Sequence, residues 1–83
     1  MSSEQLIKAW AATVTSDPCN KNRSIDDVMT ILGERTHTSV FIVRPGCLDA
    51  EKYPDVFGPF DTEEGQYLCI VPGLARGIYL QRV

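Results

Sequence analysis

The chain lacks the signatures by which most enzymes and metalloproteins are recognised. Its 83 residues hold one histidine, one tryptophan and three cysteines. They contain no glycine-rich phosphate loop and no paired cysteine or histidine spacing typical of a metal site. We therefore expect no catalytic residue, no bound metal and no cofactor, and these absences favour a protein that acts by binding.

Long apolar runs are also absent. No segment approaches the roughly 18 apolar residues that span a bilayer, and the first four residues, MSSE, lack the basic flank of a signal peptide. The cysteine count is odd, whereas secreted domains of this size usually carry an even set. We expect a cytoplasmic protein without membrane contact.

An excess of positive charge is missing too. The formal net charge is −3, which disfavours nucleic acid and anionic membranes as partners. The hydrophobic share of 43% and the charged share of 23% are ordinary for a globular protein. Because so short a chain cannot form two hydrophobic cores, we expect residues 1–83 to form a single domain.

The first third of the chain predicts two helices that pair antiparallel. Apolar residues at three- and four-residue spacing predict a helix over residues 3–15, with Trp10 in the core and Pro18 just past its end. Ser24 is a suitable N-terminal cap for the second helix, and Gly33 a suitable C-terminal cap.

Three strands are expected to follow. The segment Thr38–Val43 is apolar on both faces at its centre, which is typical of an interior strand. The segments Gln66–Val71 and Ile78–Val83 alternate and flank a turn over Pro72–Gly77, which predicts a hairpin. We therefore predict an α+β fold (ααβββ), with two N-terminal helices packed on one face of a three-stranded antiparallel sheet that ends in a C-terminal hairpin.

With the first strand at the sheet centre, one hairpin strand has to lie at the edge, and we predict the last one. An open edge can accept a strand from another protein or from a second copy, so a homodimer is also expected. The residues of this predicted edge strand are Ile78, Tyr79, Leu80, Gln81 and Arg82.

The segment 48–65 is predicted to be an irregular loop, with one helical turn between Leu48 and Tyr53, because prolines and glycines interrupt it. It holds six carboxylates and one lysine, and six negative charges against one positive leave a net charge of −5. We call it the acidic aromatic loop. Its candidate partner-binding residues are Tyr53, Phe57, Phe60, Asp61, Glu63 and Glu64.

Two interpretations of this loop stay open. In one, its aromatic side chains dock into apolar pockets of a partner that has a basic surface. In the other, Phe57 and Phe60 fold back to cap the core while the carboxylates remain in water. A variant of the first is an acidic mimic of nucleic acid that blocks a basic site.

The remaining candidates are thiols and arginines. Cys19 lies in a polar loop, Cys47 lies about ten residues after His37, and Cys69 lies in an apolar strand. A thiol enzyme or enzyme subunit using Cys19 or Cys47, and a zinc site using Cys19, His37 and Cys47, are therefore alternatives. A weak nucleic-acid binder is a further one, and its candidate residues are Arg44, Arg76 and Arg82.

Taken together, these features predict a small non-enzymatic interaction module: an accessory, regulatory or inhibitory protein. It is expected to bind another protein through the acidic aromatic loop, through the edge strand, or through both.

Overall fold

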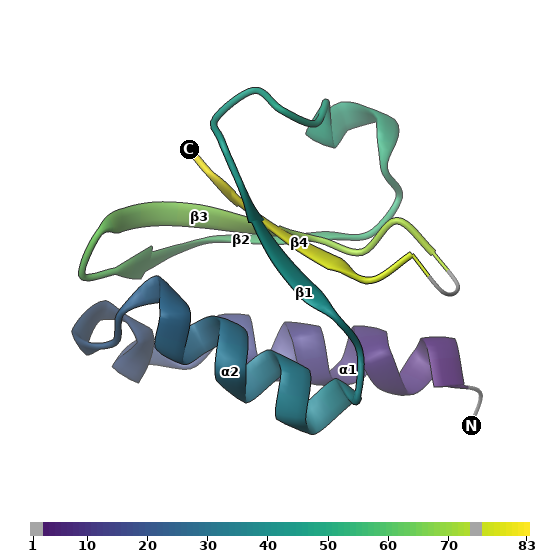
Figure 1. Cartoon of the computed structure of the whole chain (residues 1–83), viewed down its shortest axis with the longest axis horizontal. Helices are drawn as coiled ribbons and strands as arrows, with labels where there is room; N and C mark the ends of the chain where they lie inside the picture. The colour runs from purple at the N-terminus through teal and green to yellow at the C-terminus, as the bar shows by residue number, and fades with distance from the viewer. Residues whose placement is uncertain (1–2, 74–75) are drawn as a thin grey trace.

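The computed structural model describes residues 3–73 and 76–83, and within them a layer of two α-helices packs on a four-stranded mixed sheet (Figure 1). The strands are β1 (Val40–Val43), β2 (Val56–Thr62), β3 (Gly65–Ile70) and β4 (Ile78–Arg82). Their order across the sheet is β1-β4-β3-β2. The pair β1–β4 is parallel and the other two pairs are antiparallel. The predicted α+β class is confirmed, whereas the predicted three-stranded antiparallel sheet is wrong.

The first helix, α1 (Ser3–Thr15), has the predicted bounds. Ala11 and Val14 on its apolar stripe are buried, and Trp10 packs partly buried against the core, as expected. Leu6 is 46% exposed and remains outside the core. No helix in the described part of the chain is long and apolar enough to cross a membrane.

The second helix, α2 (Ile25–Thr36), begins as predicted and ends later. The Ser24 hydroxyl accepts the Asp27 N–H at its start. The predicted end at Gly33 is wrong, because His37 adopts the left-handed conformation with φ 52° and donates its N–H to the Gly33 carbonyl at 2.9 Å. This bond caps the helix one turn beyond the predicted position.

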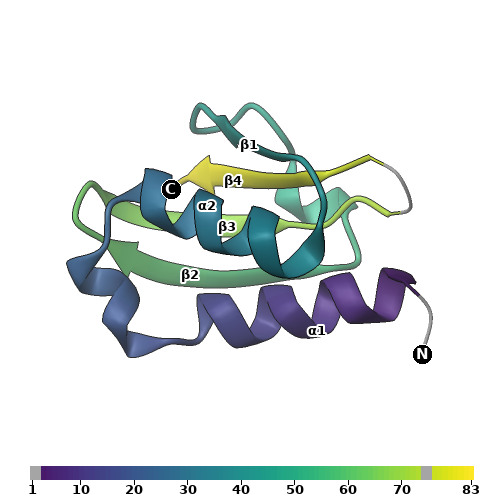
Figure 2. The ribbon, with the colours of Figure 1, turned by 60° about the horizontal axis from the view of Figure 1, so that its bottom comes forward.

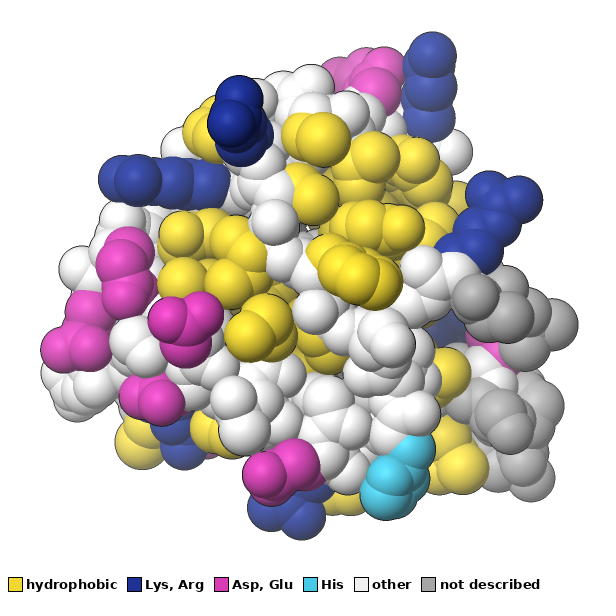
Figure 3. Space-filling view, viewed as in Figure 1, with side chains coloured by type: hydrophobic (Ala, Val, Ile, Leu, Met, Phe, Trp, Pro, Cys, Tyr) yellow, Lys and Arg dark blue, Asp and Glu magenta, His cyan; other side chains and the backbone are white. Residues whose placement is uncertain are grey.

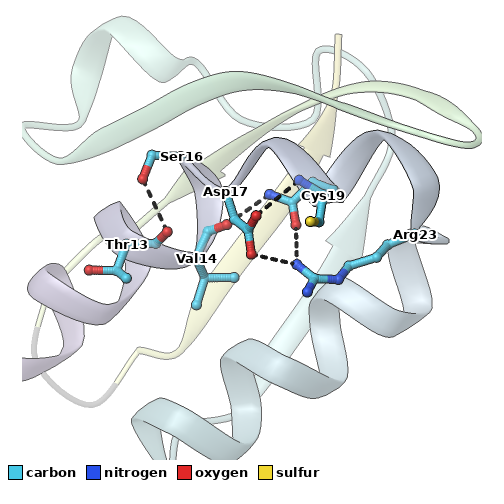
Figure 4. A network of polar contacts seen from close by, with 7 residues as sticks. Thr13, Val14, Ser16, Asp17, Cys19 and Arg23 are labelled. Atoms are coloured by element: carbon cyan, nitrogen blue, oxygen red, sulfur yellow. Dashed lines mark hydrogen bonds and ion pairs between the residues drawn. The ribbon is translucent and has the colours of Figure 1, made fainter.

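A short 3-10 helix, η1 (Pro18–Asn22), joins α1 to α2 where the sequence predicts a polar loop. Figure 4 shows its polar network: Asp17 accepts the Cys19 N–H at 2.9 Å and pairs with Arg23 at 3.1 Å. The buried Asn20 side chain donates to the Val14 carbonyl at 2.7 Å and accepts from Arg23 at 3.0 Å. These bonds satisfy polar groups where the chain turns between the two helices.

The hairpin is confirmed, since β3 and β4 pair antiparallel with Cys69 opposite Leu80. Part of its predicted turn, Leu74 and Ala75, lies outside the described residues. Alternate side chains of the two strands pack against the helices. The main buried members of this core are Ala11, Val28, Leu32, Tyr67, Cys69, Val71, Ile78 and Leu80.

The predicted places of the first and last strands in the sheet are both wrong. β4 lies between β1 and β3, so residues 78–82 form an interior strand, and β1 lies at the edge. The prediction of an irregular loop over residues 48–65 is also wrong, because β2 lies within this segment. β2 pairs with β3 and supplies the other edge of the sheet. The Gly58–Pro59 peptide is cis and sits at a register shift between Phe57 and Phe60, and an edge strand tolerates such an interruption.

The connection between β1 and β2 lies over the sheet face opposite the helices (Figures 1 and 2). It contains the predicted helical turn, η2 (Ala50–Lys52). Ile70 in β3 is fully buried although it does not belong to the core cluster that packs on the helices. The sheet face opposite the helices is therefore covered in part, and within the described residues β1 forms one edge of the sheet.

Candidate functional site

β1 has a strand neighbour on one side only within the described residues. The Ser39 carbonyl accepts the Ile78 N–H at 2.9 Å. In a parallel pair the two main-chain groups of one residue point the same way, and successive residues alternate. Residues 39, 41 and 43 therefore face β4, and Val40 and Ile42 direct their N–H and C=O groups outward.

The side chains at this edge are large and apolar. Phe41 is 47% exposed and Ile42 is 40% exposed. Phe41 stacks on Tyr79 with 5.5 Å between ring centroids, on the face away from the helices, while Ile42 aligns with Leu80 on the helix side. Figure 3 shows hydrophobic side chains gathered where β1 crosses this view, with most charged side chains toward the rim. We call the outward groups of Val40 and Ile42, together with these exposed side chains, the β1 edge.

Gly77 lets β1 approach β4 closely. A Cβ atom placed on Gly77 would lie 2.9 Å from the Ser39 carbonyl oxygen and 3.0 Å from a ring atom of Phe41. Only a residue without a side chain fits here. The sequence marks Gly77 as part of a turn, but it does not indicate that the absence of a side chain at Gly77 makes room for the Phe41 ring.

The opposite edge, β2, is protected by contrast. It carries the Gly58–Pro59 interruption and the exposed Asp61, and the next residue after its end, Glu63, donates its N–H to the Arg23 carbonyl at 3.0 Å. Prolines, bulges and charges are the usual devices that prevent another strand from pairing with an edge. Nothing of this kind stands within Val40–Val43.

The aromatic residues of the acidic aromatic loop are directed inward. Phe60 is 5% exposed and belongs to the core, and Phe57 packs partly buried against it. The part of the second interpretation in which these two rings pack on the core is thereby confirmed, although both lie in strand β2 and not in a loop. Tyr53 is half-buried at the end of η2.

Most carboxylates of that segment have partners inside the chain. Glu64 accepts the Ile25 N–H at 2.9 Å at the start of α2, and Asp61 accepts from Gln66 at 3.1 Å. Asp55 pairs with Lys8 at 3.1 Å, and this hydrogen bond is the main reason why the pKa of Lys8 is raised. The charges are distributed over several contacts, and the role of this segment in partner binding stays a prediction.

The three cysteines do not contribute to a common metal or catalytic site within the described residues. Cys19 and Cys47 are exposed, whereas Cys69 is buried, and its burial raises the pKa of the thiol to about 12. No group of three or more metal-ligating side chains occurs in the described ranges, so Cys19, His37 and Cys47 are not brought together as a zinc site.

The three arginines are likewise divided. Arg44 and Arg82 follow the aligned residues Val43 and Gln81 in adjacent strands, whereas Arg76 precedes β4 at its other end. They do not line one continuous track.

A hollow of about 350 Å³ lies between the first half of α1 and the end of α2, and Leu6, Trp10, Arg35 and His37 are among its lining residues. The Arg35 guanidinium lies 5.2 Å from the centroid of the Trp10 ring and so covers part of it. The hollow is open and offers no enclosed binding site.

Comparison with protein-family models, with curated proteins and with solved structures finds no match for this chain. Its function therefore has to be inferred from its own surface.

Proposed function

We propose that this protein is a small non-enzymatic interaction module that binds an extended segment of another polypeptide along the β1 edge. One observation carries the proposal: a strand apolar on both faces stands at an unprotected edge, with Phe41 and Ile42 exposed. A strand added there would pair with the main chain of Val40 and Ile42 and bury these two side chains.

The energetic gain comes from both kinds of contact. Burying the exposed halves of Phe41 and Ile42 would contribute roughly 1 kcal/mol each. Main-chain hydrogen bonds would add to this and would set the direction of the bound strand. Arg44 and Pro45 follow Val43 directly, so the segment of β1 that can pair with a partner strand is short. A short binding surface of this kind suits an accessory or regulatory role, which we infer for this protein.

The test compares two lysine substitutions. Ile42→Lys places a charge on the edge, and Leu6→Lys replaces a similarly exposed apolar residue on α1, 46% against 40% exposed. We expect a tagged wild-type chain and its Leu6→Lys variant to retain the same polypeptide from the source cell, and the Ile42→Lys variant to lose it. Equal retention by all three would contradict the proposal.

A second candidate surface is the acidic turn between β2 and β3, with Asp61 and Glu63 exposed at its margin. It favours a partner with a basic surface, including a nucleic-acid-binding site that the turn would block. The double variant Asp61→Asn, Glu63→Gln leaves Phe60 and the helix-capping Glu64 intact. Loss of a salt-sensitive interaction in this variant, with the Ile42→Lys variant unaffected, would favour the turn over the β1 edge.

We further propose the cytoplasm as the compartment. All three cysteines lie in the described ranges and are free, and free thiols persist where the surroundings are reducing.

A further inference from the structure

We infer that the segment filling the β1 edge is β1 of a second copy of this chain, paired antiparallel about a two-fold axis that passes beside Phe41. The inference rests on the proposed function, because it names the partner of the same edge. Two four-stranded sheets would thereby join into one continuous sheet.

β1 is complementary to the same strand of a second copy. Val40–Val43 carries apolar side chains on both faces, a pattern typical of a strand whose two faces are both buried, yet Phe41 on one face and Ile42 on the other remain partly exposed. The free chain supplies a neighbour on one side only, within its described residues. A second copy supplies a strand of equal length and equal apolarity, and a two-fold axis lets both copies use the same surface.

The outward main-chain groups select the register. Only residues that direct their groups outward can exchange hydrogen bonds, and these are Val40 and Ile42. Placing Val40 opposite the partner's Ile42, and Ile42 opposite the partner's Val40, uses the N–H and C=O of both residues in each copy. The side chains of residues opposite one another then lie on the same face of the joined sheet. The helices of both copies therefore lie on one side of it.

This register places Phe41 opposite the partner's Phe41 in a pair without mutual hydrogen bonds, where Cα atoms are about 4.5 Å apart. Close aromatic pairs across strands are stabilising. The Tyr79 ring stacked on Phe41 would extend the contact on each side.

The charges do not oppose the same pairing. Arg44 comes opposite the partner's Thr38, just beyond the C-terminal end of the partner's α2, where the helix dipole is negative but the last turn also carries Arg35. No two like charges face each other within the strands. The exposed Asp61 and Glu63 lie at the β2 side, the edge of the sheet farthest from the axis, which limits repulsion between two chains of net charge −3 each.

Sedimentation equilibrium tests the pairing with the variants Ile42→Lys and Leu6→Lys. The wild-type mass should rise from 9.2 kDa toward twice that value as the concentration increases through the micromolar range. Leu6→Lys should follow the wild type, and Ile42→Lys should raise the dissociation constant at least about tenfold, or ~1.4 kcal/mol. Amide exchange of wild-type Val40 and Ile42 should slow in step with the dimer fraction, and this measurement needs no variant.

The outcomes separate the inference from the proposed function. A wild-type dimer that Ile42→Lys leaves intact, or whose Val40 and Ile42 amides exchange as fast as in the monomer, overturns the inference. A monomer at every concentration also overturns it, but the proposed function stands if Ile42→Lys still abolishes binding to another polypeptide. A monomer for which Ile42→Lys changes no interaction overturns both.

Discussion

The side-chain amide of Gln81 holds both main-chain groups of Leu48. Its Oε1 accepts the Leu48 N–H at 2.6 Å, and its Nε2 donates to the Leu48 carbonyl at 2.9 Å. Gln81 lies in β4 and is 6% exposed, and Leu48 belongs to the connection between β1 and β2. One side chain therefore fastens this connection over the sheet face opposite the helices.

Removing this contact should destabilise the protein. Gln81→Ala leaves the N–H and C=O of Leu48 without partners, at a cost of about 1–3 kcal/mol in the free energy of unfolding. Gln66→Ala is the matched control, because Gln66 is exposed in the adjacent strand and makes one surface hydrogen bond. Urea denaturation measures both variants, and an equal loss in the two would refute the role assigned to Gln81.

The close approach of β1 to β4 predicts a difference between two glycines. Gly77 and Gly46 both have positive φ, +83° and +74°, so alanine strains the backbone at either position. Only at Gly77 does the new Cβ meet other atoms, whereas nothing lies within 4 Å at Gly46. Gly77→Ala should lose about 1–3 kcal/mol more stability than Gly46→Ala in thermal or urea denaturation. Similar losses would mean that β1 moves away at no cost.

The Asp17 contacts predict a dependence of stability on pH. The Cys19 N–H, and after it Arg23, lower the pKa of the Asp17 carboxyl below its ordinary value of 3.8. A lowered pKa in the folded state stabilises the protein above the ordinary value, and this contribution is lost as the pH falls through the lowered pKa. The stability difference between wild type and Asp17→Asn should therefore be larger near neutral pH than in acid.

Asp26→Asn serves as the control for that measurement, because Asp26 is an exposed carboxylate in the first turn of α2. Chemical denaturation across the acid range measures all three proteins. A pH-independent difference for Asp17→Asn would contradict the prediction.

Thiol labelling should divide the cysteines by burial. Cys19 and Cys47 are exposed and should react in the native protein, whereas Cys69, with its pKa raised to about 12, should react only after unfolding. Intact-mass spectrometry during labelling counts the added groups, and Cys69→Ala should remove the slow step alone. Labelling of Cys47 or Cys19 far faster than the other exposed thiol would instead favour the thiol-enzyme alternative.

Much of the local structure was predictable from the sequence. The spacing of apolar residues located α1 within its bounds, and the hydroxyl of Ser24 marked the start of α2. Alternation located β3 and β4. Strand β2 was not predictable, because Gly58 and Pro59 interrupt it and the edge position that permits them is a property of the folded sheet.

The candidate site was predicted in kind but in the wrong place. An open edge strand was expected at residues 78–82 and is found at Val40–Val43. The apolar residues on both faces of Thr38–Val43 predict an interior strand, whereas Phe41 and Ile42 are exposed at the β1 edge.

The sequence by itself determined the elements whose signal is local: two helices from their period and caps, and a hairpin from alternation around a turn. Only the tertiary structure decided the strand order, because each strand offers two edges and local residues do not specify which partner takes them. The parallel pairing of β1 with β4 joins segments that lie far apart in the sequence. β2 lies beside β3 through a tight turn over residues 63–64, and Thr62 and Gly65 pair on either side of it. The pairing of β1 with β4 places the last strand in the interior of the sheet. It leaves the main-chain groups of Val40 and Ile42 facing outward.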